Sequence, residues 1–136
     1  MFSTGVTNFH PLINNENSAI LGVCGLQNNG FNIETSRRFQ DPSAWYHVVA
    51  AVDTTKSTYN TGVRIYINGK QETSFSATTY NQNVTTPFCT NGSKVVLGAR
   101  PTDDAQELDG YIAETHFIDG LALGCEYFGE NDPDNK

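Results

Sequence analysis

Short segments in which apolar and polar residues alternate dominate the chain, and helical periodicity is nearly absent. The clearest alternation lies in 63–68, where an apolar residue stands at every second position. Asn68-Gly69 follows and supplies the two residues of a type I′ turn, after which 71–75 returns as the second strand. This stretch therefore predicts a tight antiparallel hairpin.

Further strands are predicted where β-branched and aromatic residues gather between polar turn clusters. The segment 45–53 is apolar on both faces, which is typical of a central strand with packing above and below. Asn28-Asn29-Gly30 is expected to turn the chain between two paired strands. The other elements expected are strands over 19–23, 31–35, 94–98 and 109–118, loops over 77–93 and 100–107, and a short helical turn within 121–128.

About seven short strands joined by turns predict one all-β domain, which is either a sandwich or a barrel. We expect this domain to span 1–128 and a polar tail to follow over 129–136. A chain of 136 residues buries roughly two-thirds of the surface that it exposes when unfolded, which is enough for a core.

Charge and hydropathy exclude several classes of protein. The net charge is −7 at pH 7, and the pair Arg37-Arg38 is too small to be a basic patch, so we expect no binding of nucleic acid. No apolar run is long enough to span a bilayer, so we expect no membrane insertion. The first residues have neither a basic nor an apolar region, and we therefore expect no signal peptide.

The three cysteines, Cys24, Cys89 and Cys125, are widely spaced. Without a C-x-x-C pair they do not predict a zinc site. Either one disulfide with a free thiol or three free thiols is compatible with the sequence.

Several short motifs occur in one order along the chain. They are W-x-H-V within 45–48, (I/V)-Y-(I/V)-N-G within 65–69, L-G at 97–98 and D-G-x-I-A-E within 109–114. This ordered set resembles the concanavalin A-like lectin/glucanase superfamily, in its laminin-G and pentraxin-like branch. More narrowly, DPSAWYHVV and VDTT followed by DGYIAETHFIDGLAL resemble a domain of tail fibres and other virion proteins of marine bacteriophages.

The resemblance implies a jelly-roll β-sandwich of two antiparallel sheets. Domains of this group usually begin before the segment that 2–5 matches and continue beyond the segment that 128–132 matches. We therefore expect a chain that is either cropped at both ends or a small stand-alone version. If it is complete, terminal strands are missing, and the open edge predicts a homo-oligomer or a part of a larger assembly.

Some members of the superfamily hydrolyse β-glucans with three acids in the pattern E-x-D-x-x-E, or the same pattern without one x. Glu107 and Asp109 begin this pattern, but Tyr111 and Ile112 stand where the last Glu is needed. Glu114 comes too late, and its parity places it on the opposite face of an extended strand. No G-x-S-x-G motif is present either. We therefore expect no enzyme, and a degenerate glycoside hydrolase is the remote alternative.

Laminin-G and pentraxin relatives often bind Ca²⁺ through oxygen ligands from loops at one rim, so Ca²⁺ is the candidate cofactor. A solvated acidic loop is the simpler interpretation of the same residues. The candidate ligands are Asp103, Asp104, Glu107 and Asp109, with Asp53 and Asn60 as loop alternatives.

Glycan binding needs aromatic platforms together with amide or carboxylate groups, and relatives bind sugars at this rim or on the concave face. Aromatic residues on sheet faces are otherwise packing residues, which is the alternative here. We expect the four tyrosines of the candidate set to be exposed. The candidate glycan-binding residues are Tyr59, Tyr66, Tyr80, Tyr111, Asn81 and Asn83.

These observations predict a non-enzymatic domain on the surface of a virion, in a phage tail fibre, an appendage or the capsid. Its expected partners are host-surface glycans or other virion proteins. A purely structural decoration or fibre subunit is the alternative, which an open sheet edge would favour.

Overall fold

The computed structural model describes residues 8–11, 24–28, 31–39, 41, 43–84 and 111–129. Strands are the main elements of this part of the chain. They are β1 (Asn8–Pro11), β2 (Cys24–Asn28), β3 (Phe31–Thr35), β4 (Val48–Val52), β5 (Val63–Ile67), β6 (Lys70–Gln71) and β7 (Phe75–Tyr80). The helical elements are the single turn α1 (Tyr59–Gly62) and the 3₁₀ turn η1 (Cys125–Tyr127).

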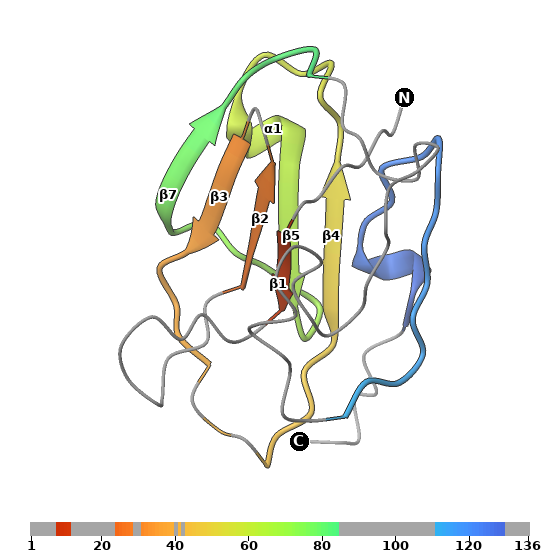
Figure 1. Ribbon diagram of the computed structural model, residues 1–136. Coiled ribbons are helices and arrows are strands. Elements are labelled where there is room, and N and C mark those ends of the chain that lie inside the picture. Colours follow the sequence, from red (N-terminus) through yellow and green to blue (C-terminus); the bar gives the residue numbers. More distant parts are fainter. Residues whose placement is uncertain are drawn as a thin grey trace.

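The strands form two antiparallel sheets within the described ranges (Figure 1), as predicted. One sheet has the order β1-β2-β3-β7 and the other the order β4-β5-β6. Asn28 at the end of β2 lies opposite Phe31 at the start of β3, so a two-residue connection joins them and the predicted hairpin is confirmed. The strand that enters this hairpin is 24–28, whereas the predicted 19–23 lies outside the described residues.

The Asn68-Gly69 turn between β5 and β6 is confirmed in position and in turn type. The return strand predicted over 71–75 is wrong beyond Gln71, because β6 is only Lys70–Gln71 and Phe75 begins a strand of the other sheet. Asn68 has φ 49° and Gly69 has φ 75°, the left-handed pair that a type I′ turn requires. The Asn68 N–H donates to the carbonyl of His47 at 2.8 Å, and the Asn68 side-chain oxygen accepts from the His47 N–H at 2.8 Å. One residue therefore turns the chain and also closes the end of the β4–β5 ladder.

The chain changes sheets directly after this hairpin. β6 ends at Gln71, and β7 begins at Phe75 as the partner of β3 in the other sheet. The expectation of a loop over 77–93 is therefore wrong for its first residues, because β7 runs to Tyr80. The run Thr78-Thr79-Tyr80 is polar in part, but β-branched and aromatic residues have a high propensity for strands.

The core lies between the two sheets and is built mainly from β-branched side chains. β4 is covered on both faces, as predicted: Val49 and Ala51 are buried on one side, and Val48 and Ala50 pack against the core from the other. Its predicted central position is wrong among the described strands, because β4 stands at the end of the order β4-β5-β6. Each buried aliphatic side chain of this size contributes about 1.5–3 kcal/mol. The core cluster consists of Ile33, Phe39, Val52, Val63, Ile65 and Ile67.

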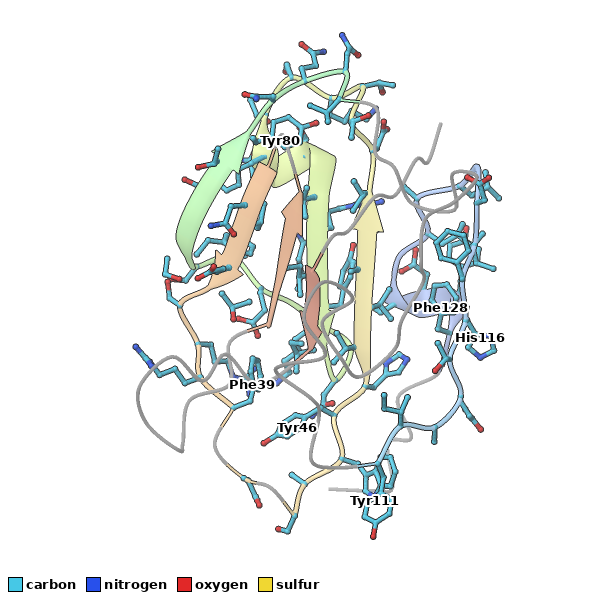
Figure 2. All side chains as sticks on the ribbon, viewed as in Figure 1. Phe39, Tyr46, Tyr80, Tyr111, His116 and Phe128 are labelled. Atoms are coloured by element: carbon cyan, nitrogen blue, oxygen red, sulfur yellow. The ribbon has the colours of Figure 1, made fainter. Side chains whose placement is uncertain are left out.

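An aromatic contact extends the core toward the start of β4. The ring of Tyr46 meets that of Phe39 edge-on, with the centroids 5.4 Å apart (Figure 2). The neighbouring Trp45 instead has 68% of its surface exposed. The two adjacent aromatic residues therefore have opposite environments, as the alternation of an extended chain requires.

The prediction of a long strand over 109–118 is wrong for the described residues 111–118. They belong to no strand, and every residue of 111–120 is exposed. Glu114 has φ 51°, a left-handed conformation that interrupts an extended chain. The alternation of residue types in this stretch is genuine, but alternation produces a strand only where a ladder partner and a covering layer are available.

The C-terminal segment 111–129 runs beside β4 (Figure 1) and is joined to the hairpin of β5 and β6. The Arg64 guanidinium donates to the carbonyl of Ala122 at 2.8 Å, and the Cys125 thiol donates to the carbonyl of Gly69 at 3.5 Å. η1 confirms the short helical turn expected within 121–128. Among the residues with described structure, no helix has the length and apolarity needed to cross a membrane.

Substitution of two isoleucines by alanine distinguishes the core from this segment. Ile65 is fully buried, whereas 50% of Ile112 is exposed. We expect Ile65→Ala to lower the free energy of unfolding by about 2–5 kcal/mol, and Ile112→Ala to change it by about 0.5 kcal/mol or less. Guanidinium unfolding followed by circular dichroism measures both. Equal losses would show that 111–118 belongs to the core after all.

Candidate functional site

Two polar loops meet at one end of the sandwich and form what we call the rim, residues 53–61 and 80–84. The first loop begins where β4 ends, and Asp53 shapes it. The Asp53 carboxylate accepts hydrogen bonds from the Thr55 N–H at 3.0 Å and from the Thr55 hydroxyl at 2.6 Å. An aspartate that bonds to its own backbone two residues on stabilises a tight turn.

The single turn α1 completes the first loop and depends on a glycine. The Gly62 N–H donates to the carbonyl of Thr58 at 2.9 Å, which closes the turn. A Cβ atom at Gly62 would collide with the ring and hydroxyl of Tyr80. Glycine therefore allows the side chain of β7 to lie directly against α1.

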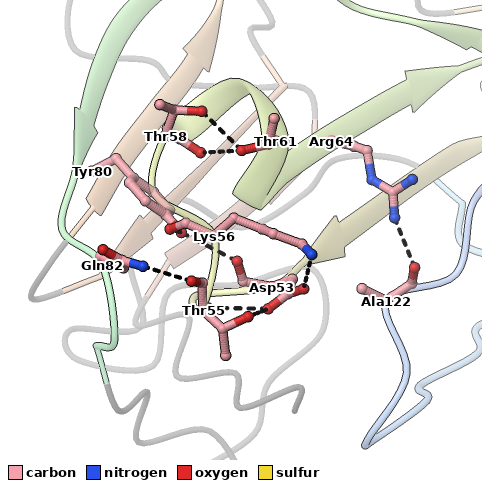
Figure 3. Close-up of polar contacts among 9 residues, drawn as sticks. All are labelled: Asp53, Thr55, Lys56, Thr58, Thr61, Arg64, Tyr80, Gln82 and Ala122. Carbon is pink, nitrogen blue, oxygen red and sulfur yellow. Dashed lines mark hydrogen bonds and ion pairs between the residues drawn. The ribbon is translucent and has the colours of Figure 1, made fainter.

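Tyr80 links the two loops and the two sheets. Its hydroxyl lies 3.2 Å from the carbonyl oxygen of Asp53 and 2.9 Å from that of Lys56 (Figure 3). The single hydroxyl proton bonds to one of these oxygens at a time, so they share it. Burial, and secondly the negative charge of Asp53, raise the pKa of Tyr80 above its ordinary value of 10.0.

The second loop is fastened to the first by two more hydrogen bonds. The side-chain amide of Gln82 donates to the carbonyl of Thr55, and the Asn83 N–H donates to the carbonyl of Thr54, both at 2.7 Å. Asn83 adopts φ 58°, a left-handed conformation that asparagine tolerates better than most residues. The backbone carbonyls of 53–56 are thus partly satisfied by groups from 80–83.

The electrostatics of the rim centre on Asp53. The hydrogen bond from the Thr55 hydroxyl is the largest influence on its pKa, which lies below the ordinary value of 3.8. The Thr55 N–H and the charge of Lys56, whose ammonium lies 3.7 Å from the carboxylate, act in the same direction, and partial burial opposes them. The carboxylate is therefore ionised at neutral pH and already engages two hydrogen-bond donors and one ion-pair partner.

The structure brings four of the six candidate glycan-binding residues to the rim: Tyr59, Tyr80, Asn81 and Asn83. Tyr66 lies elsewhere and is only 9% exposed, so the expectation that it is an exposed aromatic is wrong. β5 is the middle strand of its sheet, where both faces are covered. Tyr111 is 88% exposed but lies at the opposite end of the molecule from Tyr80 (Figure 2).

The two rim tyrosines are engaged in packing. Tyr59 is half-buried, and its ring meets that of Phe75 edge-on with the centroids 6.0 Å apart. Tyr80 is half-buried against Gly62. The exposed residues of the rim instead carry hydroxyl and amide groups, some of which also bond to one another. They are Thr55, Thr58, Asn60, Thr61, Asn81, Gln82 and Asn83.

The candidate calcium ligands Asp103, Asp104, Glu107 and Asp109 lie outside the described residues, so this site stays a prediction. The two alternative calcium ligands both have partners within the rim. The Asp53 carboxylate contacts Thr55 and Lys56, and the Asn60 side-chain oxygen accepts a hydrogen bond from the Thr58 hydroxyl at 2.6 Å. Across the part of the chain that the structure describes, no three His, Cys, Asp or Glu residues gather as a metal site would require.

The role of Gln82 in the rim was missed by the sequence interpretation. Its contact with Thr55 joins residues 27 positions apart, and no local pattern indicates such a pairing. The signal that was available is the run Asp53-Thr54-Thr55, because Asp and Thr side chains bond to nearby backbone groups and so favour a loop over a continued strand.

Removal of one hydroxyl tests the link made by Tyr80. We expect Tyr80→Phe to lower the free energy of unfolding by about 0.5–1.5 kcal/mol and to speed amide exchange of the Asn83 N–H. The ring stays in place, so the change isolates the hydrogen bonds. Tyr59→Phe is the matched control, because the Tyr59 hydroxyl makes no hydrogen bond among the described residues. A similar loss in both variants would rule out a special role for Tyr80.

The lowered pKa of Asp53 predicts a dependence of stability on pH. Because this pKa is lower in the folded protein than in the unfolded chain, the carboxylate stabilises the fold above its ordinary pKa. That stabilisation is lost as the pH falls through the pKa that Asp53 has in the folded protein. We expect Asp53→Asn to lose less stability than the wild type between about pH 6 and about pH 3, in urea unfolding.

The control for this experiment is Asp119→Asn in the C-terminal segment, where the side chain is exposed. It should lose as much stability at acid pH as the wild type. If Asp53→Asn behaves in the same way as this control, the carboxylate at 53 contributes nothing to acid unfolding.

The match to a family model agrees with this architecture. The model described as the concanavalin A-like lectin/glucanases superfamily matches residues 1–123. No curated protein and no solved structure matches the chain significantly. The match covers most of the 136 residues, and two facing antiparallel sheets are the arrangement that this superfamily predicts. The chain therefore belongs to the concanavalin A-like lectin/glucanase superfamily.

Proposed function

We propose that this chain is a non-enzymatic carbohydrate-binding domain and that the rim is part of its binding surface. The observation that carries the proposal is the gathering of exposed amide and hydroxyl side chains on two interlocked loops. It occurs in a chain whose superfamily includes lectins as well as glycosidases. Amide and hydroxyl groups both donate and accept hydrogen bonds, which is what the hydroxyls of a sugar require.

The internal fastening of the rim supports a binding role. The contacts of Tyr80, Gln82 and Asn83 with 53–56 hold the two loops together before any ligand arrives. A loop that is already ordered loses less conformational entropy on binding, so less of the interaction energy is spent on ordering it.

The proposal of a non-enzyme rests on the carboxylates. A retaining glycosidase needs two of them about 5–5.5 Å apart, one to attack and one to move the proton. Asp53 is the single carboxylate of the rim, and the hydrogen bonds from Thr55 and the ion pair with Lys56 already engage it. In the sequence, Tyr111 and Ile112 interrupt the acid pattern that begins at Glu107.

The setting that we propose is the surface of a bacteriophage particle, where the ligand would be a host-surface glycan. The support is the resemblance of DPSAWYHVV, VDTT and DGYIAETHFIDGLAL to domains of phage virion proteins. A structural subunit of the same particle is the second candidate. It is favoured by the exposed apolar side chains of the C-terminal segment, which include Tyr111, Ile112, Leu121 and Tyr127.

A glycan array probed with the purified chain tests the proposed function. We expect binding to at least one bacterial surface glycan, and a loss of about two- to tenfold in affinity for Asn81→Ala, the value of one hydrogen bond. Asn81 makes no hydrogen bond within the described structure, so its loss should leave stability unchanged. Gln71→Ala, exposed on β6, is the matched control and should bind as the wild type does.

Calcium and oligomeric mass complete the experiment. Binding that EDTA abolishes would support the acidic ligands at 103–109, and binding that EDTA leaves unchanged would exclude the metal. Absence of binding by a folded oligomer, whose mass in solution is measured in parallel, would contradict the carbohydrate proposal and support the structural subunit.

A further inference from the structure

The turn between β5 and β6 contains the dipeptide Asn68-Gly69, and an Asn-Gly pair is prone to deamidation. In an Asn-Gly pair, the backbone nitrogen of the glycine attacks the side-chain amide carbon of the asparagine. The nitrogen gives up its proton, ammonia leaves, and a five-membered imide forms. Water then opens the imide at one of its two carbonyls, which yields aspartate or isoaspartate. Glycine favours this attack because it has no side chain to hinder the approach.

Asn68 is exposed to the water that this reaction consumes, yet its side chain is fixed. The amide oxygen accepts the His47 N–H at 2.8 Å, and the Asn68 N–H donates to the His47 carbonyl at the same distance. The amide carbon is therefore held toward β4. Gly69 carries the chain to β6, on the other side of β5, and the Cys125 thiol lies 3.5 Å from its carbonyl oxygen.

We propose that Asn68 is a site of deamidation that is closed in the folded protein and opens when the last rung between β4 and β5 separates. The hydrogen bonds to His47 keep the amide carbon away from the Gly69 nitrogen. Release of His47 frees the side chain to rotate onto that nitrogen. The rate of deamidation at Asn68 therefore reports the fraction of molecules in which this end of the ladder is open.

The product would prevent the rung from forming again. Isoaspartate routes the backbone through the former side chain and lengthens it by one carbon, so the two left-handed residues of the turn no longer fit a two-residue connection. Either product also carries a negative charge that asparagine lacks. In aspartate this charge replaces the side-chain amide, and in isoaspartate it lies on the former backbone carbonyl carbon. One chemical event would then mark a molecule whose hairpin had opened.

The test is a comparison of rates. The full chain is incubated at mildly alkaline pH, with and without denaturing guanidinium, and peptide mapping by mass spectrometry follows the gain of one dalton at Asn68. Two hydrogen bonds of ordinary strength correspond to a rate roughly 30-fold lower in the folded protein. Equal rates, or a faster reaction in the folded protein, would overturn the proposal.

A proline substitution tests the role of His47 itself. His47→Pro removes the N–H that holds the Asn68 oxygen, and we expect deamidation at Asn68 to accelerate about tenfold. Trp45→Pro is the matched control, because the Trp45 N–H has no acceptor within the described ranges, and its rate should equal that of the wild type. Equal acceleration in both variants would overturn the proposal. If His47→Pro does not fold, the deamidation rate of the wild type is measured at guanidinium concentrations below the unfolding midpoint. A rate that rises steadily with guanidinium supports the proposal, and a constant rate would overturn it.

Discussion

The contact between the two sheets is the constraint on which the rest of the molecule depends. Ile33 of β3 joins a cluster with Val63 and Ile65 of β5, and this apolar layer sets the separation of the sheets. The chain crosses this layer at 72–74. It leaves one sheet at Gln71, at the end of the hairpin of β5 and β6, and enters the other sheet at Phe75. The rim then forms where β4 and β7 end.

The rim is therefore a product of the core rather than an independent loop structure. Tyr80 is placed by its pairing with Phe31 on β3, and Asp53 by its position directly after β4. The hydroxyl of Tyr80 spans the sheets because those two strand ends face each other across the apolar layer. The Tyr80 hydroxyl and the Gln82 amide are used to join the loops, whereas the side chains of Asn81 and Asn83 stay exposed.

Local features of the fold were predictable from the sequence, and features that depend on distant residues were not. Asn68-Gly69 specifies its turn because both left-handed residues are adjacent, and the burial of β4 follows from an apolar run alone. The absence of a strand at 111–118 could not be foreseen, because alternation does not reveal whether a ladder partner exists. The burial of Tyr66 follows from the central place of β5, and the Tyr80–Asp53 contact joins residues 27 apart.

The exposure of Trp45 has a consequence for how the protein is observed. It is the single tryptophan of the chain, and 68% of its surface faces solvent. Its indole emission therefore arises from a hydrated ring both before and after unfolding, and the emission maximum moves little when the core is lost. The same ring is sensitive to anything that covers the start of β4. Tryptophan fluorescence thus reports contacts made by the surface, and the far-ultraviolet signal of the strands reports the fold.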